Sequence, residues 1–128
     1  MSQIMDNKPA EPVEVPLNIA VLTVSDTRTL ETDKSGDTLI KCLEEAGHKL
    51  GDRAIVPDDV YKLRATISNW IADENIHCII STGGTGFSGR DSTPEAVAPL
   101  LDKVIDGFGE VFRMLSYEEI KTSTIQSR

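Results

Sequence analysis

The stretch LNIAVLTV, residues 17–24, decides the fold. It is a nearly continuous apolar run with several β-branched residues, which is typical of a β-strand covered on both faces. Two later apolar segments, residues 53–56 and 77–81, predict two further strands. Each of these strands is followed by a segment with helical periodicity, so we expect strands and helices to alternate along the chain.

The predicted helices cover residues 35–46, 60–72 and 108–120, with another opening at Thr93-Pro94, where Thr93 is the expected cap. The face expected to be buried in residues 35–46 consists of Leu39, Cys42, Leu43 and Ala46. The corresponding face of residues 60–72 consists of Leu63, Ile67, Trp70 and Ile71. This order predicts an α/β fold of three layers, αβα, with a mostly parallel central sheet.

Composition limits the domain organisation and the partners. Residues 1–16 contain three prolines among polar residues and are predicted to be a flexible tail, which leaves residues 17–128 as one domain. A net charge of −8 without a basic stripe argues against nucleic acid as a partner. No signal peptide or 18-residue apolar stretch is visible, so we expect a cytoplasmic protein without membrane contact. Cys42 and Cys78 match no metal or redox spacing and are expected to be small core residues.

The ends of the three predicted strands carry the polar candidates for a site. They are Ser25-Asp26, Pro57-Asp58-Asp59 and Thr82-Gly83-Gly84. In open parallel sheets, ligands bind beyond the carboxyl ends of the strands. These three distant segments are therefore predicted to converge on one ligand site.

The loop of residues 81–91, STGGTGFSGRD, carries four glycines within seven residues directly after a predicted strand. Glycines allow the backbone to turn tightly and to approach a ligand, and successive N–H groups can bind an anion. The hydroxyl groups of Thr82 and Thr85 are further possible donors. The alternative is a merely flexible turn. The spacing of Gly84, Gly86 and Gly89 formally fits a dinucleotide fingerprint, but it follows the third strand rather than the first, and there is no Walker A lysine.

Asp91 stands at the mouth of this loop, where a carboxylate would repel a phosphate unless a cation bridged the two. Mg²⁺ fits this role because it binds one or two carboxylates together with phosphate oxygens. Asp26 and Asp58 are the expected co-ligands or positioning groups, although each alone could be a helix cap or turn former. His48 and His77 lack partners at metal-ligand spacing and are not expected to be catalytic.

The residues also resemble a known family. Residues 82–86, TGGTG, and 90–96, RDSTPEA, resemble the signature of the molybdopterin adenylyltransferase family. Val24-Ser25-Asp26, Ser35-Gly36 and Val56-Pro57-Asp58 stand upstream in the expected order. Residues 107–116, GFGEVFRMLS, are similar to the branch called molybdenum cofactor biosynthesis protein B.

This resemblance implies a molybdopterin-binding α/β domain that forms homotrimers or homohexamers. It also implies a reaction in which the phosphate of molybdopterin attacks the α-phosphate of MgATP, releasing pyrophosphate. Asp58 and Asp91 match the acids associated with catalysis and magnesium. The substrate-binding positions it implies are Ser25, Asp26, Ser35, Thr82, Gly83, Gly84, Thr85, Gly86 and Glu110.

One departure from the family bears on the activity. The family continues past the position of Arg128 into a further strand, a Pro-Gly turn and a closing helix, which contribute to the nucleotide side of the pocket. We expect this chain to lack those elements, which would leave a sheet edge uncovered. The alternative function is a non-catalytic protein that binds molybdopterin or assembles with partners of the same pathway.

Overall fold

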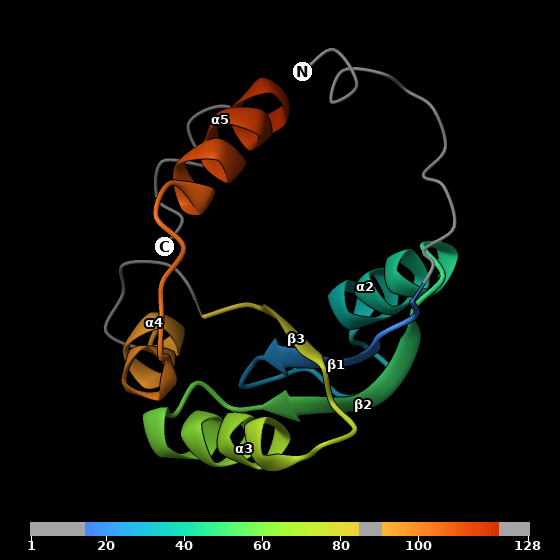
Figure 1. The fold of residues 1–128 in the computed structure, drawn as a ribbon. Coiled ribbons are helices and arrows are strands. Elements are labelled where there is room, and N and C mark those ends of the chain that lie inside the picture. The colour runs from blue at the N-terminus through green and yellow to red at the C-terminus, as the bar shows by residue number, and fades with distance from the viewer. Residues whose placement is uncertain (1–14, 85–90, 121–128) are drawn as a thin grey trace.

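The computed structural model describes residues 15–84 and 91–120, with side chains as far as Leu115 in the second range. Its sheet contains strands β1 (Asn18–Val24), β2 (Lys49–Val56) and β3 (Cys78–Thr82) in the order β2-β1-β3. Both strand pairs are parallel (Figure 1). The central strand β1 is buried on both faces, as its unbroken apolar sequence requires.

Helices cover both faces of the sheet, which gives the predicted three layers. Helix α2 (Lys34–Glu45) packs on one face, where Leu43 meets Ile19 and Val21. Helices α3 (Val60–Ala72) and α4 (Thr93–Val97) pack on the other face and form the larger core. Its buried residues are Ala20, Leu22, Val24, Val56, Leu63, Ile67, Trp70 and Ala96.

Three expectations about these elements were wrong. Strand β2 begins at Lys49 rather than Arg53, because backbone pairing with β1 extends it through polar residues that an edge strand tolerates. Cys42 is exposed, since the buried stripe of α2 is centred on Leu43 and Cys42 lies about 100° around the helix. Ile71 is also exposed, at 57%, although Trp70 beside it is buried.

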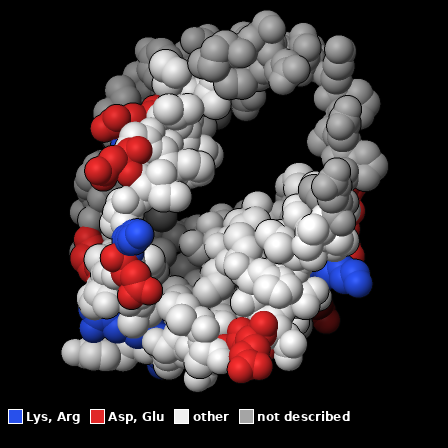
Figure 2. Space-filling model, in the orientation of Figure 1, with Lys and Arg blue, Asp and Glu red and all other residues white. Residues whose placement is uncertain are grey.

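A short 3-10 turn, η1 (Ala98–Leu100), leads from α4 towards helix α5 (Phe108–Ile120), which stands away from the sheet (Figure 1). Its large apolar side chains are exposed, with Phe108 at 68%, Phe112 at 54% and Met114 at 63%. Figure 2 shows that the surface of α5 turned towards the sheet lacks charged groups, whereas acidic groups lie on its outer side. Within the described residues, no helix is long and apolar enough to cross a membrane.

Candidate functional site

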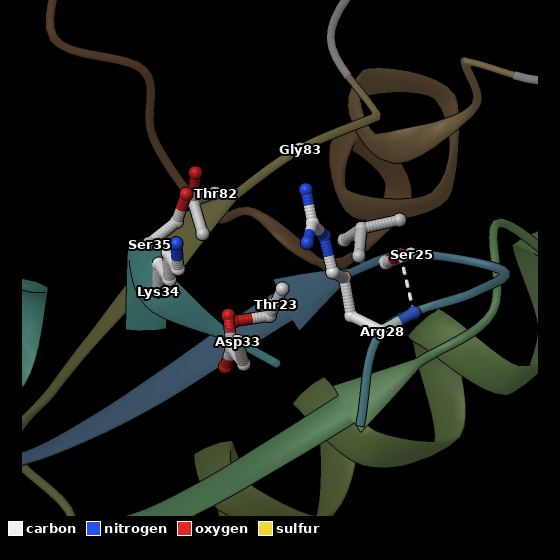
Figure 3. Close-up of a pocket in the computed structure, with 9 residues that line it drawn as sticks. Thr23, Ser25, Arg28, Asp33, Lys34, Ser35, Thr82 and Gly83 are labelled. Atoms are coloured by element: carbon white, nitrogen blue, oxygen red, sulfur yellow. Dashed lines mark hydrogen bonds between the residues drawn. The ribbon is translucent and has the colours of Figure 1, made fainter. Parts of the chain in front are cut away.

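The carboxyl ends of the strands meet at a topological switch point. From β1 the chain passes through α2 to β2 on one side, and then through α3 to β3 on the other side. Crevices at such points are the usual ligand sites of open α/β sheets. A hollow of about 160 Å³ lies here, and we call it the switch-point pocket (Figure 3). Its lining consists of Thr23, Val24, Ser25, Arg28, Asp33, Lys34, Ser35, Thr82 and Gly83.

Gly83 and Gly84 form the tight turn that ends β3 beside this pocket. Both have positive φ, +95° and +68°, a conformation that favours glycine. A Cβ at Gly83 would collide with the carbonyl oxygen of Val24, and one at Gly84 would collide with Thr93 Oγ1. The turn is held by Thr93, whose hydroxyl donates to the Gly83 carbonyl and whose N–H donates to the Gly84 carbonyl, each at 3.1 Å. Gly83 thus allows a close approach to the backbone of Val24, and Gly84 allows a close approach to the side chain of Thr93.

We expect Gly84→Ala to lower the free energy of unfolding by about 1–3 kcal/mol, because it adds strain at positive φ and displaces Thr93. The matched control is Gly107→Ala, since Gly107 also has positive φ (+84°) but has open space around its Cβ position. In the control variant, the free energy of unfolding should fall only by the cost of backbone strain at positive φ, about 1 kcal/mol. Urea unfolding of both variants checks this, and equal losses would show that the contact with Thr93 is not important.

Asp26, Asp58 and Ser92 form an acidic group at the same edge. The Oδ1 atom of Asp58 accepts hydrogen bonds from the Ser92 N–H, at 3.0 Å, and from the Ser92 hydroxyl. The Asp58 N–H donates to Asp26 Oδ1 at 3.1 Å. Asp91 directly precedes Ser92 and is half-buried, so it lies at the same end of the sheet. Hydrogen bonds therefore join the first two strand ends directly, and Ser92 and Thr93 connect them to the glycine turn after β3.

The acidic group offers one free oxygen for a cation. Within residues 15–84 and 91–120, Asp58 Oδ2 accepts no hydrogen bond. No cluster of three or more His, Cys, Asp or Glu in that part of the chain is arranged to hold a metal on protein ligands alone. Mg²⁺ commonly keeps several waters and uses only one or two carboxylates plus phosphate oxygens. Asp58 Oδ2 therefore fits a magnesium ion that takes its other ligands from water and phosphate, and Asp91, at the same end of the sheet, is the predicted second carboxylate.

Asp33 lies buried at the base of the pocket and is fully bonded. Its Oδ1 accepts from the Gly36 N–H at 2.9 Å, which caps α2, and its Oδ2 accepts from the Thr23 hydroxyl at 2.8 Å and from Arg53 at 3.1 Å. Burial raises the pKa of Asp33, but these hydrogen bonds outweigh burial and hold the pKa below its usual value. Hydrogen bonds to Asp33, and then to Asp37, raise the pKa of Arg53 against its own desolvation. Asp33 is thus an ionised carboxylate with a structural role, and its charge is compensated by its hydrogen-bond donors.

The predicted site residues fall into two adjoining groups. Four of them line the switch-point pocket: Ser25, Ser35, Thr82 and Gly83. The acidic group contains Asp26 and Asp58, with Asp91 next to it. Gly84 joins the two groups, because its Cβ position is 3.3 Å from Asp58 Oδ2.

The structure does not place the other three predicted residues in this arrangement. Thr85 and Gly86 lie outside the described residues. Glu110 is exposed in the first turn of α5, and α5 stands away from the sheet, so this chain does not bring Glu110 to the pocket.

The sequence analysis missed several residues of the site. Thr93 was expected to cap α4, but Ser92 is the N-cap residue and Thr93 holds the glycine turn instead. Arg28 and Lys34 were not predicted, because no sequence motif marks them. Arg28 lies in the loop after β1, and Lys34 is the first residue of α2. His48 and His77 lie at the opposite end of the sheet, where their Nδ1 atoms accept from the N–H groups of Leu17 and Asn18.

The fold and the site together define an open α/β protein with a ligand site at its switch point, built from a glycine turn, hydroxyl groups and carboxylates. A family model described as "Probable molybdopterin binding domain" matches residues 20–128. The chain belongs to this family of molybdopterin-binding domains of molybdenum cofactor biosynthesis proteins.

Individual relatives agree with this assignment. The chain is 52% identical over 114 residues to molybdenum cofactor biosynthesis protein B of Escherichia coli (strain K12), covering 89% of this chain and 67% of the relative. A crystal structure of a molybdenum cofactor biosynthesis protein B matches with a TM-score of 0.86 and 45% identity over 91% of this chain and 73% of that one. The tungsten cofactor synthesizing protein MoaB from Pyrococcus furiosus matches with a TM-score of 0.76 and 36% identity, covering 91% and 72%. The predicted fold class and family are confirmed.

Proposed function

We propose that this protein binds molybdopterin at the switch-point pocket and adenylates its phosphate with MgATP in molybdenum cofactor biosynthesis. The family assignment supports the pterin, and the site supports the phosphate chemistry. The observation that carries the proposal is the contact between the two groups of the site, where Gly83 lines the pocket and Gly84 adjoins Asp58. This adjacency supports transfer between a phosphate bound in the pocket and a metal-bound triphosphate held at the carboxylates.

The reaction requires little covalent chemistry from the protein. An oxygen of the molybdopterin phosphate forms a bond to the α-phosphorus of ATP, the bond to the β-phosphate breaks, and pyrophosphate leaves with its electrons. The attacking phosphate is already ionised, so no general base is needed. The protein contributes mainly positioning of the two reactants in line. Magnesium, when bound, neutralises charge on the triphosphate, and Asp58 and Asp91 are the residues that would hold it.

Self-association of the chain belongs to the same proposal. The apolar side chains of α5 are exposed in the single chain, and a monomer rarely leaves so many large ones together in water. A homotrimer or homohexamer that buries α5 would remove this surface. It would also offer a route by which Glu110 of one chain could approach a site.

A single-turnover assay tests the catalytic proposal. The chain is mixed with molybdopterin, ATP and Mg²⁺ under anaerobic conditions, and pyrophosphate and adenylated pterin are quantified. A version extended to the length of the relatives is measured in parallel. Equal amounts of both products are expected from the extended version. Molybdopterin binding without product in both versions would contradict adenylation and favour the non-catalytic binding protein.

A further inference from the structure

The switch-point pocket carries positive charge that the described residues leave uncompensated. Arg28 and Lys34 both line it. Within the described residues neither cation has a carboxylate within ion-pair distance. In the same part of the chain the guanidinium of Arg28 donates one hydrogen bond, from Nη1 to the Thr32 carbonyl at 3.3 Å, although it has five N–H donors. These free cations occur in a chain with a net charge of −8, so they are not part of a generally basic surface.

The carboxylate in the pocket does not cancel these charges. Both oxygens of Asp33 already accept hydrogen bonds from Gly36, Thr23 and Arg53, and Arg53 also pairs with exposed Asp37. Figure 3 shows the guanidinium of Arg28 reaching towards Gly83, with Ser35 and Thr82 on the other side of the hollow. An anion between them would meet a cation on one side and hydroxyl groups on the other.

The size of the pocket limits its occupant. Its volume is about 160 Å³. Sites for whole drug-sized ligands are roughly 300–1,000 Å³. The pocket therefore suits a phosphate group, with the rest of the ligand outside it.

The two groups of the site differ in the phosphate that they suit. A phosphate that arrives without a metal needs cations from the protein, whereas a metal-bound triphosphate needs carboxylates. We propose that Arg28 and Lys34 bind the bare phosphomonoester of the pterin in the switch-point pocket, while the acidic group serves the magnesium-bound nucleotide. This assignment rests on the proposed function. Ser25 lines the pocket and Asp26 belongs to the acidic group, so consecutive residues hold the two reactants close together.

Binding measurements on Arg28→Gln test the assignment. We expect the affinity for molybdopterin to fall by about 10- to 100-fold, the range for loss of a hydrogen bond to a charged group. The affinity for dephosphorylated molybdopterin and for MgATP should change less than about twofold, because neither places a bare phosphomonoester in the pocket. Arg28→Lys should restore part of the affinity, and Arg28→Gln with Lys34→Gln should weaken binding further. The matched control is Lys41→Gln, since Lys41 lies on α2 and its one ion pair among the described residues is with exposed Glu45.

The outcomes separate this inference from the proposed function. Equal losses for phosphorylated and dephosphorylated pterin, or a loss of MgATP binding instead, would overturn the assignment while leaving molybdopterin binding intact. Absence of molybdopterin binding in the unmodified chain would overturn the proposed function and the assignment of the pocket to the pterin. Inorganic phosphate as a thermal-shift probe, at constant ionic strength, then still reports on the pocket. A phosphate-induced rise in melting temperature that is lost in Arg28→Gln and kept in Lys41→Gln would support a phosphate site in the pocket. No such rise in the unmodified chain would exclude one.

Discussion

Asp58→Asn is expected to lower the single-turnover rate of adenylation by roughly 10²–10³-fold while molybdopterin affinity changes little. The side chain amide can keep its oxygen in the place of Oδ1, so the hydrogen bonds from Ser92 survive. Its nitrogen replaces Oδ2, the oxygen that accepts no hydrogen bond within the described residues. The change thus removes the proposed metal ligand without removing the hydrogen bonds from Ser92. Single-turnover rates at saturating MgATP measure the effect on catalysis, and direct binding measurements give the effect on molybdopterin affinity.

The neighbouring residue provides the control for this prediction. Asp59 caps α3 by accepting from the Lys62 N–H at 2.9 Å, and asparagine is an equally good cap. Asp59→Asn therefore makes the same change of charge one residue away and should leave the rate unaltered. Similar losses from both variants would show that general electrostatics, rather than a ligand role of Asp58, sets the rate.

Asp33→Ala is expected to cost about 2–4 kcal/mol of the free energy of unfolding. The side chain is 1% exposed, and its removal leaves the Thr23 hydroxyl without its partner, Arg53 with only one of its two carboxylates, and α2 without its cap. Asp37 gives the matched control, because it binds the same guanidinium at 2.8 Å but is 59% exposed. Asp37→Ala should cost less than about 1 kcal/mol, as exposed pairs do. Urea unfolding at neutral pH measures both, and equal losses would contradict a special role for Asp33.

Acid titration of stability tests the same carboxylate independently. Its pKa in the folded protein lies below that of the unfolded chain, so the unfolded state binds the proton first as the pH falls. The stabilisation from ionised Asp33 is complete above the unfolded pKa and is lost as the pH falls through the folded pKa. The difference in stability between the unmodified chain and Asp33→Ala should therefore narrow on acidification. A difference that stayed constant would show that the charge contributes nothing.

Much of the fold could be predicted because its signals are local. The apolar run of β1 needs cover on both faces, and the periodicity of α3 and α5 gave their bounds correctly. Errors arose where tertiary pairing overrides local preference, as at the polar start of β2 and the exposed Cys42. The convergence of three strand ends was also predictable, since parallel strands place their carboxyl ends at one edge.

The sequence by itself determined the layers, the parallel sheet, the glycine turn and the family, because each depends on neighbouring residues or on a contiguous motif. Only the tertiary structure decided how the site residues divide. Asp33 stood among ordinary helix-opening acids in the sequence, yet it is buried against Thr23 and Arg53. Arg28 and Lys34 line the same pocket as Thr82 and Gly83, which lie about 50 residues later in the chain. Such contacts depend on the packing of α2 against the sheet, which no local pattern records.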